Sequence, residues 1–171
     1  MLAPLVAVFF LSFRIEWMSL VAAQVTFWIY AALMGLSLSS IFLIYTGASV
    51  VRTFFIAAAT FGAISLYGYM TGRDLSRAGS FLFMGLIGIL LAGLINLFVA
   101  SPVVELAISV IGVIVFVGRS TYDTQRIRQI YEERDPDEAL SKKALIGALT
   151  LYLDFINLFV MLLRFTGQRG E

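Results

Sequence analysis

The sequence is dominated by long runs without a charged residue, and each run is a candidate to cross a membrane. A helix needs about 20 apolar residues to span about 30 Å of hydrocarbon. The runs occupy residues 1–13, 17–51, 53–72, 78–104, 106–118 and, interrupted only by Asp154, 144–163. This pattern favours a chain that is folded within a lipid bilayer.

Composition excludes several other classes of protein. The chain is 60% hydrophobic and 13% charged, whereas soluble domains are about 45–50% apolar and about 25% charged. Disorder requires low hydrophobicity and high net charge. The net charge of +1 offers no electrostatic footprint for nucleic acid. The absence of cysteine and histidine excludes disulfides, thiolate catalysis and metal sites built from these residues.

The runs are apolar throughout and do not alternate as barrel strands do, so we predict helices. The expected fold is a single all-α polytopic domain over residues 1–171. Six transmembrane helices are expected at about 1–14, 18–45, 50–71, 79–100, 103–123 and 144–165. The fifth should continue as a cytoplasmic helix to about residue 134, before Pro136. The first run is short for a span, which suggests a helix whose outer part is missing or one that begins at the terminus.

Basic residues are unevenly divided between the two sides of these six spans. One side receives most of them, and the positive-inside rule makes it cytoplasmic: Arg14, Arg73, Arg77, Arg119, Arg126, Arg128, Arg134, Lys142 and Lys143. The other side receives Arg52, Arg164 and Arg169. The one sizeable polar segment, 124–143, is interpreted as a solvated cytoplasmic loop, with a docking surface for a partner as the alternative.

Asp154 is the most informative residue, because it lies near the middle of a span. An intramembrane carboxylate costs at least about 2.5–3.5 kcal/mol on insertion scales. Thr150 and Asn157 fall on the same face of the helix at offsets of −4 and +3. This face should point into the bundle or into water. Asp154 is then either a proton- or ion-linked group or a neutral acid that holds helices together by a hydrogen bond.

Asp123 is the candidate partner, because it closes the fifth span at its cytoplasmic end. Arg119 and Arg126, at i−4 and i+3, would satisfy it locally in the alternative reading. Arg14 is a third charge at similar depth, although a lone boundary arginine usually extends to the headgroups.

Several segments together resemble the Bax inhibitor-1 family, also called the transmembrane Bax inhibitor motif family, in a bacterial form. The matching segments are 35–42 (GLSLSSIF), 72–76 (GRDLS), 81–98, 109–118, 122–125 (YDTQ) and 149–157 (LTLYLDFIN). The resemblance implies a seven-helix bundle whose last helix is surrounded by the others. The family's first helix and the start of its second have no counterpart here.

The resemblance also implies a function. Family members are associated with a pH-sensitive calcium leak and with protection against stress-induced cell death, and some bacterial relatives are linked to a membrane-bound quality-control protease. The sensor aspartates of the family fall on Asp123 and Asp154, and its bridging arginine falls on Arg14. Tyr122, Thr150 and Asn157 would form the supporting polar face. The expected location is the bacterial inner membrane, with the bilayer, calcium or protons, and a membrane protease as partners.

The chemistry of the pair supports such a gate. Two carboxyl groups in a poorly solvated site resist simultaneous ionisation, so a shared proton would join the fifth and sixth spans. Losing it would leave two like charges that separate the helices or admit a cation. Calcium prefers six to eight oxygen ligands, so Asp123 and Asp154 would bind it only transiently as the permeant ion. No other cofactor is expected.

Two alternatives remain. The first is a non-conducting regulator that binds a protease through residues 126–143. The second, remote alternative is an intramembrane aspartyl protease, in which the second aspartate follows Gly-x-Gly. Here Leu151 and Leu153 occupy the glycine positions. We therefore expect no enzymatic activity.

Overall fold

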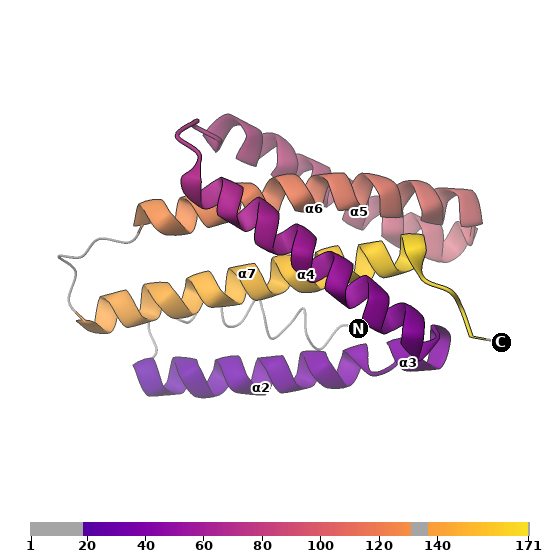
Figure 1. Cartoon of the computed structure of the whole chain (residues 1–171), viewed down its shortest axis with the longest axis horizontal. Coiled ribbons are helices and arrows are strands. Elements are labelled where there is room, and N and C mark those ends of the chain that lie inside the picture. Colours follow the sequence, from indigo (N-terminus) through magenta and orange to yellow (C-terminus); the bar gives the residue numbers. More distant parts are fainter. Residues whose placement is uncertain (1–18, 131–136, 171) are drawn as a thin grey trace.

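The computed structural model describes residues 19–130 and 137–170, which form a bundle of helices. In chain order these are α2 (Leu20–Leu38), α3 (Ile41–Ile44), α4 (Gly47–Met70), α5 (Ser76–Val99), α6 (Pro102–Ile130) and α7 (Asp137–Thr166). Successive long helices run up and down the bundle (Figure 1). Apart from one isolated backbone bridge, the described ranges contain no β-structure.

Five helices in the described ranges are long and apolar enough to cross a membrane, with α2 and α3 counted together. This confirms the predicted all-α polytopic membrane fold. The expected first span, residues 1–14, lies outside the described residues, so the structure describes five spans where the sequence predicts six.

The expected single helix over 18–45 is broken near its end. α2 ends at Leu38, and the four-residue α3 begins at Ile41. The Ser39 hydroxyl donates to the Leu36 carbonyl at 2.6 Å, and the Ser40 hydroxyl donates to the Ser37 carbonyl at 2.9 Å. Serine hydroxyls that bond to nearby backbone groups compete with the regular helix. These two serines explain why the chain turns here.

α7 begins at Asp137 and so reaches seven residues further than the expected start at 144. Residues 137–143 were expected in a solvated loop and are helical instead. Ala139, Leu140 and Lys142 are good helix formers, and a helix need not end where it leaves the hydrocarbon. α6 continues past the expected span end at 123 as far as Ile130, in line with the expected cytoplasmic extension, whose expected end near residue 134 lies outside the described residues.

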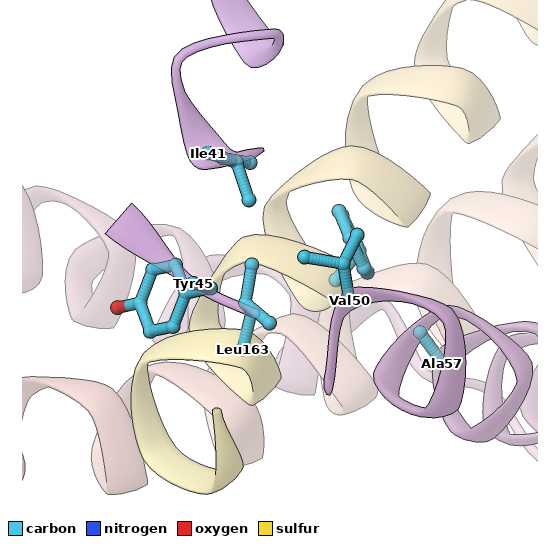
Figure 2. Packing of buried hydrophobic residues seen from close by; sticks show 6 residues of the cluster. Ile41, Tyr45, Val50, Ala57 and Leu163 are labelled. Atoms are coloured by element: carbon cyan, nitrogen blue, oxygen red, sulfur yellow. The ribbon is translucent and has the colours of Figure 1, made fainter. Parts of the chain in front are cut away.

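α7 lies between α2 and α6, and α4 crosses it (Figure 1). Leu158 and Leu163 on α7 are almost fully buried. Figure 2 shows one end of this core, where Leu163 meets Ile41, Tyr45 and Val50 from α3, the following turn and α4. Large apolar side chains elsewhere point outward, such as Phe98 on α5, which is 91% exposed. An apolar exterior is what a bilayer-embedded bundle requires.

The bundle has two distinct ends. The basic end carries the loop between α4 and α5, the last turn of α6 and the first turns of α7, with Arg73, Arg128 and Lys143. The tail end carries α3 and residues 167–170, the tail segment. Figure 1 places these two ends at opposite sides of the view.

The tail segment is fastened to the turn between α3 and α4. The Thr46 N–H donates to the Gln168 carbonyl at 3.0 Å, and the Gly170 N–H donates to the Ile44 carbonyl at 3.0 Å. The Gln168 N–H donates to the Ser49 hydroxyl at 2.9 Å. These bonds hold the end of α7 against α3 and α4.

Candidate functional site: a buried pair of aspartates

The half of α6 nearest the basic end carries polar side chains inside the bundle. The buried members of this run are Ser120, Thr121, Asp123, Thr124 and Gln125. The three hydroxyls donate to carbonyls four residues earlier on the same helix, at 2.8–2.9 Å. They therefore need no partner on another helix. Asp123, which is 3% exposed, cannot donate to a backbone carbonyl when it is ionised; its partner on the same helix is Arg119, one turn earlier.

Asp154 lies near the middle of α7 and is 4% exposed. Its carboxyl group and that of Asp123 both lie within 4.0 Å of one atom, Nε of Arg119, at the contact between α6 and α7. The structure therefore brings together the two aspartates that the sequence analysis singled out.

Arg119 is the cation that serves both carboxyl groups. Its Nε lies 3.1 Å from Oδ2 of Asp123 and 4.0 Å from Oδ1 of Asp154. The guanidinium also lies over the Phe83 ring of α5, 5.9 Å from the ring centroid. The exposed Arg126 acts on Asp123 as a more remote charge. One close guanidinium thus faces two buried acids.

One oxygen of each aspartate lacks a hydrogen bond. Oδ2 of Asp123 and Oδ2 of Asp154 are buried and find no hydrogen-bond partner among the described residues, although Oδ2 of Asp123 is the oxygen that lies 3.1 Å from Nε of Arg119. Buried polar atoms are nearly always satisfied, and an exception requires an explanation such as a proton, a water or an ion. Oδ2 of Asp154, which has neither a hydrogen bond nor an ion pair among the described residues, marks this contact as a place where such a species would fit.

The other expected site residues lie elsewhere or outside the described ranges. Arg14 is outside them. The hydroxyl of Thr150 donates to the Ile146 carbonyl at 2.9 Å, and the exposed Asn157 donates to the Leu153 carbonyl at 2.8 Å. Both polar groups are thus used on α7 itself. The Tyr122 ring packs against Gly79 of α5, 2.6 Å from where a Cβ at that glycine would lie.

Sequence reasoning missed part of this arrangement. It considered Arg119 only as a local partner of Asp123, because the i−4 spacing says nothing about α7. It assigned no role to Gln125 and Arg128, whose partners are backbone groups of a distant loop. Backbone carbonyls have no sequence signature, so no pattern could have revealed these contacts.

The site is too sparse to be a tight metal centre. Within the described residues, no group of three or more acidic side chains is placed to hold an ion. A separate apolar groove of about 480 Å³ lies between α2, α3, α4 and α7, lined by residues such as Leu38, Phe54 and Phe159. Neither aspartate lines that groove.

Comparison with known proteins identifies relatives along the full length of the chain. The family profile described as "Inhibitor of apoptosis-promoting Bax1" matches residues 1–171. The inner membrane protein YbhL of Escherichia coli K12 is 51% identical over 170 residues, covering 98% of this chain and 73% of YbhL. The protein RP147 of Rickettsia prowazekii is 50% identical over 171 residues, covering 100% of this chain and 72% of RP147.

A membrane protein of Streptococcus pyogenes serotype M3, SpyM3_0260, is 43% identical over 147 residues, covering 86% of this chain and 64% of that protein. Together with the five apolar helices, these likenesses identify a multi-pass protein of the bacterial inner membrane. The profile covers the two helices that carry Asp123 and Asp154 as well as the rest of the bundle. The chain therefore belongs to the Bax inhibitor-1 family.

Proposed function

We propose that the chain is a pH-sensitive cation leak pathway, with calcium as a permeant ion, gated by Asp123 and Asp154 and serving protection under stress. The observation that carries this proposal is the contact of two buried aspartates around one arginine in the membrane-spanning bundle. The family is not a known enzyme family.

The charge balance of the site depends on one proton. With one proton shared, a single carboxylate faces the Arg119 guanidinium and the three groups together are neutral. With both carboxyls ionised, the three groups carry a net negative charge. An unbalanced charge in a poorly solvated interior is strongly unfavourable. Separation of α6 and α7, entry of water, or entry of a cation would therefore lower the electrostatic free energy of the doubly ionised pair.

Calcium is chemically suited to neutralise the net negative charge of the doubly ionised pair. It is a hard cation that takes carboxylate oxygens, and it requires six to eight of them. The pair offers four oxygens, of which Oδ2 of Asp154 has neither a hydrogen-bond partner nor an ion-pair partner within the described ranges. A site that is attractive but incomplete favours passage over retention, because conduction needs binding that is weak enough for the ion to leave.

The test is calcium flux into liposomes that contain the purified protein and a trapped calcium indicator, measured over a series of pH values. Asp154→Asn keeps the shape of the side chain and removes its titration. We expect it to abolish the pH dependence of flux. Glu105→Gln is the matched control, because Glu105 pairs with Arg169 at 3.5 Å near the tail end, away from the aspartate pair. If Asp154→Asn leaves flux and its pH dependence unchanged, the aspartate pair is not the gate.

The sign of the pH response identifies the conducting state. We expect flux to rise with pH, because loss of the shared proton leaves two like charges across the α6–α7 contact. Flux that rises on acidification would instead mean that the ionic bridge through Arg119 holds the closed state and that protonation releases it.

The alternative proposal is a non-conducting regulator that binds a membrane protease. Its supporting observation is that α6 and α7, at 29 and 30 residues, are longer than a span requires and carry charged residues at the basic end. Absence of calcium flux at every pH, combined with co-purification of a protease that is lost when residues 137–143 are scrambled, would favour this reading.

A further inference from the structure

Gln125 makes an unusual set of contacts for a side chain on a membrane-spanning helix. It is 6% exposed, and its partners are backbone groups of the loop between α4 and α5. Its Oε1 accepts from the Leu75 N–H at 3.2 Å, and its Nε2 donates to the Arg73 carbonyl at 2.7 Å and to the Thr71 carbonyl at 3.5 Å. The amide therefore uses its acceptor and its donors on one loop.

Two further contacts lie along the same face of α6. Arg128 donates to the Tyr69 carbonyl, and its guanidinium lies 5.0 Å from the centroid of the Tyr69 ring. Thr121 meets Gly68 of α4 through its backbone, because a Cβ at Gly68 would overlap the Thr121 carbonyl. Thr121, Gln125 and Arg128 are spaced i, i+4, i+7 and so share one helix face. We call these three residues the α6 clamp.

Asp123 lies on the other side of the helix from the clamp. It is two residues from both Thr121 and Gln125, which corresponds to a rotation of about 200° around the axis. The clamp faces α4 and its loop, while Asp123 faces α7. The rotation of α6 that the clamp fixes is therefore the rotation that presents Asp123 to Asp154.

We propose that Gln125 is a positioning residue for Asp123: by fastening α6 to the α4–α5 loop, it sets the rotation and height at which Asp123 meets Asp154 and Arg119. The inference rests on the proposed function for its effect on flux, but not for its effect on geometry. The charged groups that act on Asp123 are Asp154 on α7 and Arg119 and Arg126 on its own helix. Gln125 carries no charge, so it would alter the pH response only through position.

The chain contains no cysteine, so an introduced pair reports the geometry without background. Ile127 is one turn from Asp123 on the same face, and its Cγ2 lies 3.1 Å from where a Cβ at Gly147 of α7 would be. The reporter is the rate at which the pair Ile127→Cys and Gly147→Cys forms a disulfide under mild oxidation in membranes. This rate is measured with and without Gln125→Leu.

Gln129→Leu is the matched control, because Gln129 is an exposed glutamine one turn further along α6. We expect Gln125→Leu to slow the cross-link by roughly threefold to tenfold, the population change that a lost hydrogen bond or two corresponds to. Gln129→Leu should leave the rate unchanged. Without the introduced cysteines, Gln125→Leu should also shift or flatten the pH profile of flux, and Gln129→Leu should not.

Equal cross-linking rates in the Gln125→Leu and Gln129→Leu backgrounds would overturn the proposal. If Gln125→Leu does not fold, Gln125→Asn provides the same test, because its amide is one methylene shorter and cannot reach all three loop groups. If the protein does not conduct at any pH, the proposed function fails while the cross-linking result still decides the role of Gln125.

Discussion

Gly68 of α4 and Thr121 of α6 meet backbone to backbone, with no room for a side chain between them. A Cβ at Gly68 would overlap the Thr121 carbonyl and lie 3.2 Å from its Cα. We expect Gly68→Ala to destabilise the bundle by about 1–3 kcal/mol, because neither backbone can move aside cheaply. The control is Gly62→Ala on the same helix, where no described atom lies within 4 Å. The melting temperature in detergent should fall for Gly68→Ala and not for Gly62→Ala. Equal melting temperatures for the two variants would contradict the close contact.

Removing Arg119 should change the pH at which flux is half-maximal. Its guanidinium is the close cation for both aspartates, and a neighbouring cation opposes protonation of a carboxylate. We expect Arg119→Gln to move the midpoint to higher pH, whichever state conducts. Arg119→Lys, which keeps the charge, should move it less, and so should Arg126→Gln at the exposed position. Coincident profiles for Arg119→Gln and the unaltered protein would exclude Arg119 as the shared counter-ion.

Opening should occur at the basic end, because the tail segment holds the other end of α7. A disulfide from Ile127→Cys and Gly147→Cys would join α6 to α7 near the aspartates. We expect it to reduce flux severalfold, with recovery on reduction. The comparison pair is Gly112→Cys and Met161→Cys, where the Met161 sulfur lies 2.9 Å from the position of a Cβ at Gly112. This second disulfide lies in the half of the bundle nearest the tail end and should leave flux unchanged. If instead the second disulfide reduced flux and the first did not, the moving contact would lie at the tail end.

The tail segment should be sensitive to a single methyl group at Gly167. A Cβ there would overlap the Leu163 carbonyl and lie 2.7 Å from the Tyr45 ring. We expect Gly167→Ala to cost about 1–3 kcal/mol and to expose residues 167–170 to proteolysis. Gly170→Ala, with no described atom within 4 Å, should do neither. Equal proteolysis rates in the two variants would argue against a fastened tail.

Asp74 makes the local stability of the start of α5 depend on pH. Hydrogen bonds from Ser76, through its side chain and its backbone N–H, hold the pKa of the Asp74 carboxyl below its usual value. The folded state therefore favours the carboxylate, and this contribution is present above the usual aspartate pKa and lost as pH falls through the lowered one. We expect hydrogen exchange at the Ser76 N–H to accelerate, relative to an unstructured reference, only under strongly acidic conditions. Asp74→Ala should show the accelerated exchange already at neutral pH.

The helices were predictable because the hydrocarbon core demands long apolar runs, and few charged residues were available to obscure them. Asp154 was detectable for the same reason, since it stands alone in such a run. The break at Ser39 and Ser40 was not predicted, because serine hydroxyls are accommodated in many continuous helices.

The composition of the site was less predictable than its position. Helical spacing places Asn157 on the face of Asp154, yet Asn157 is exposed. Helical spacing tells which face of a helix a residue occupies, but not whether a neighbouring helix covers that residue. Arg119 illustrates the same limit, because its reach to Asp154 depends on how α6 and α7 are aligned. That alignment comes from packing, such as Gly147 against Ile127, between residues far apart in the chain.

The fastening of the tail segment has a consequence for biosynthesis. Gln168 is joined to Ser49 across 119 residues of sequence, so this contact cannot form until α5, α6 and α7 have all been made. A chain emerging from the ribosome would insert its helices in order and form the contact between Gln168 and Ser49 only afterwards. A ribosome that stalls before residue 167 would therefore leave an inserted bundle that is open at one end, and such a product should be recognisable to membrane proteases.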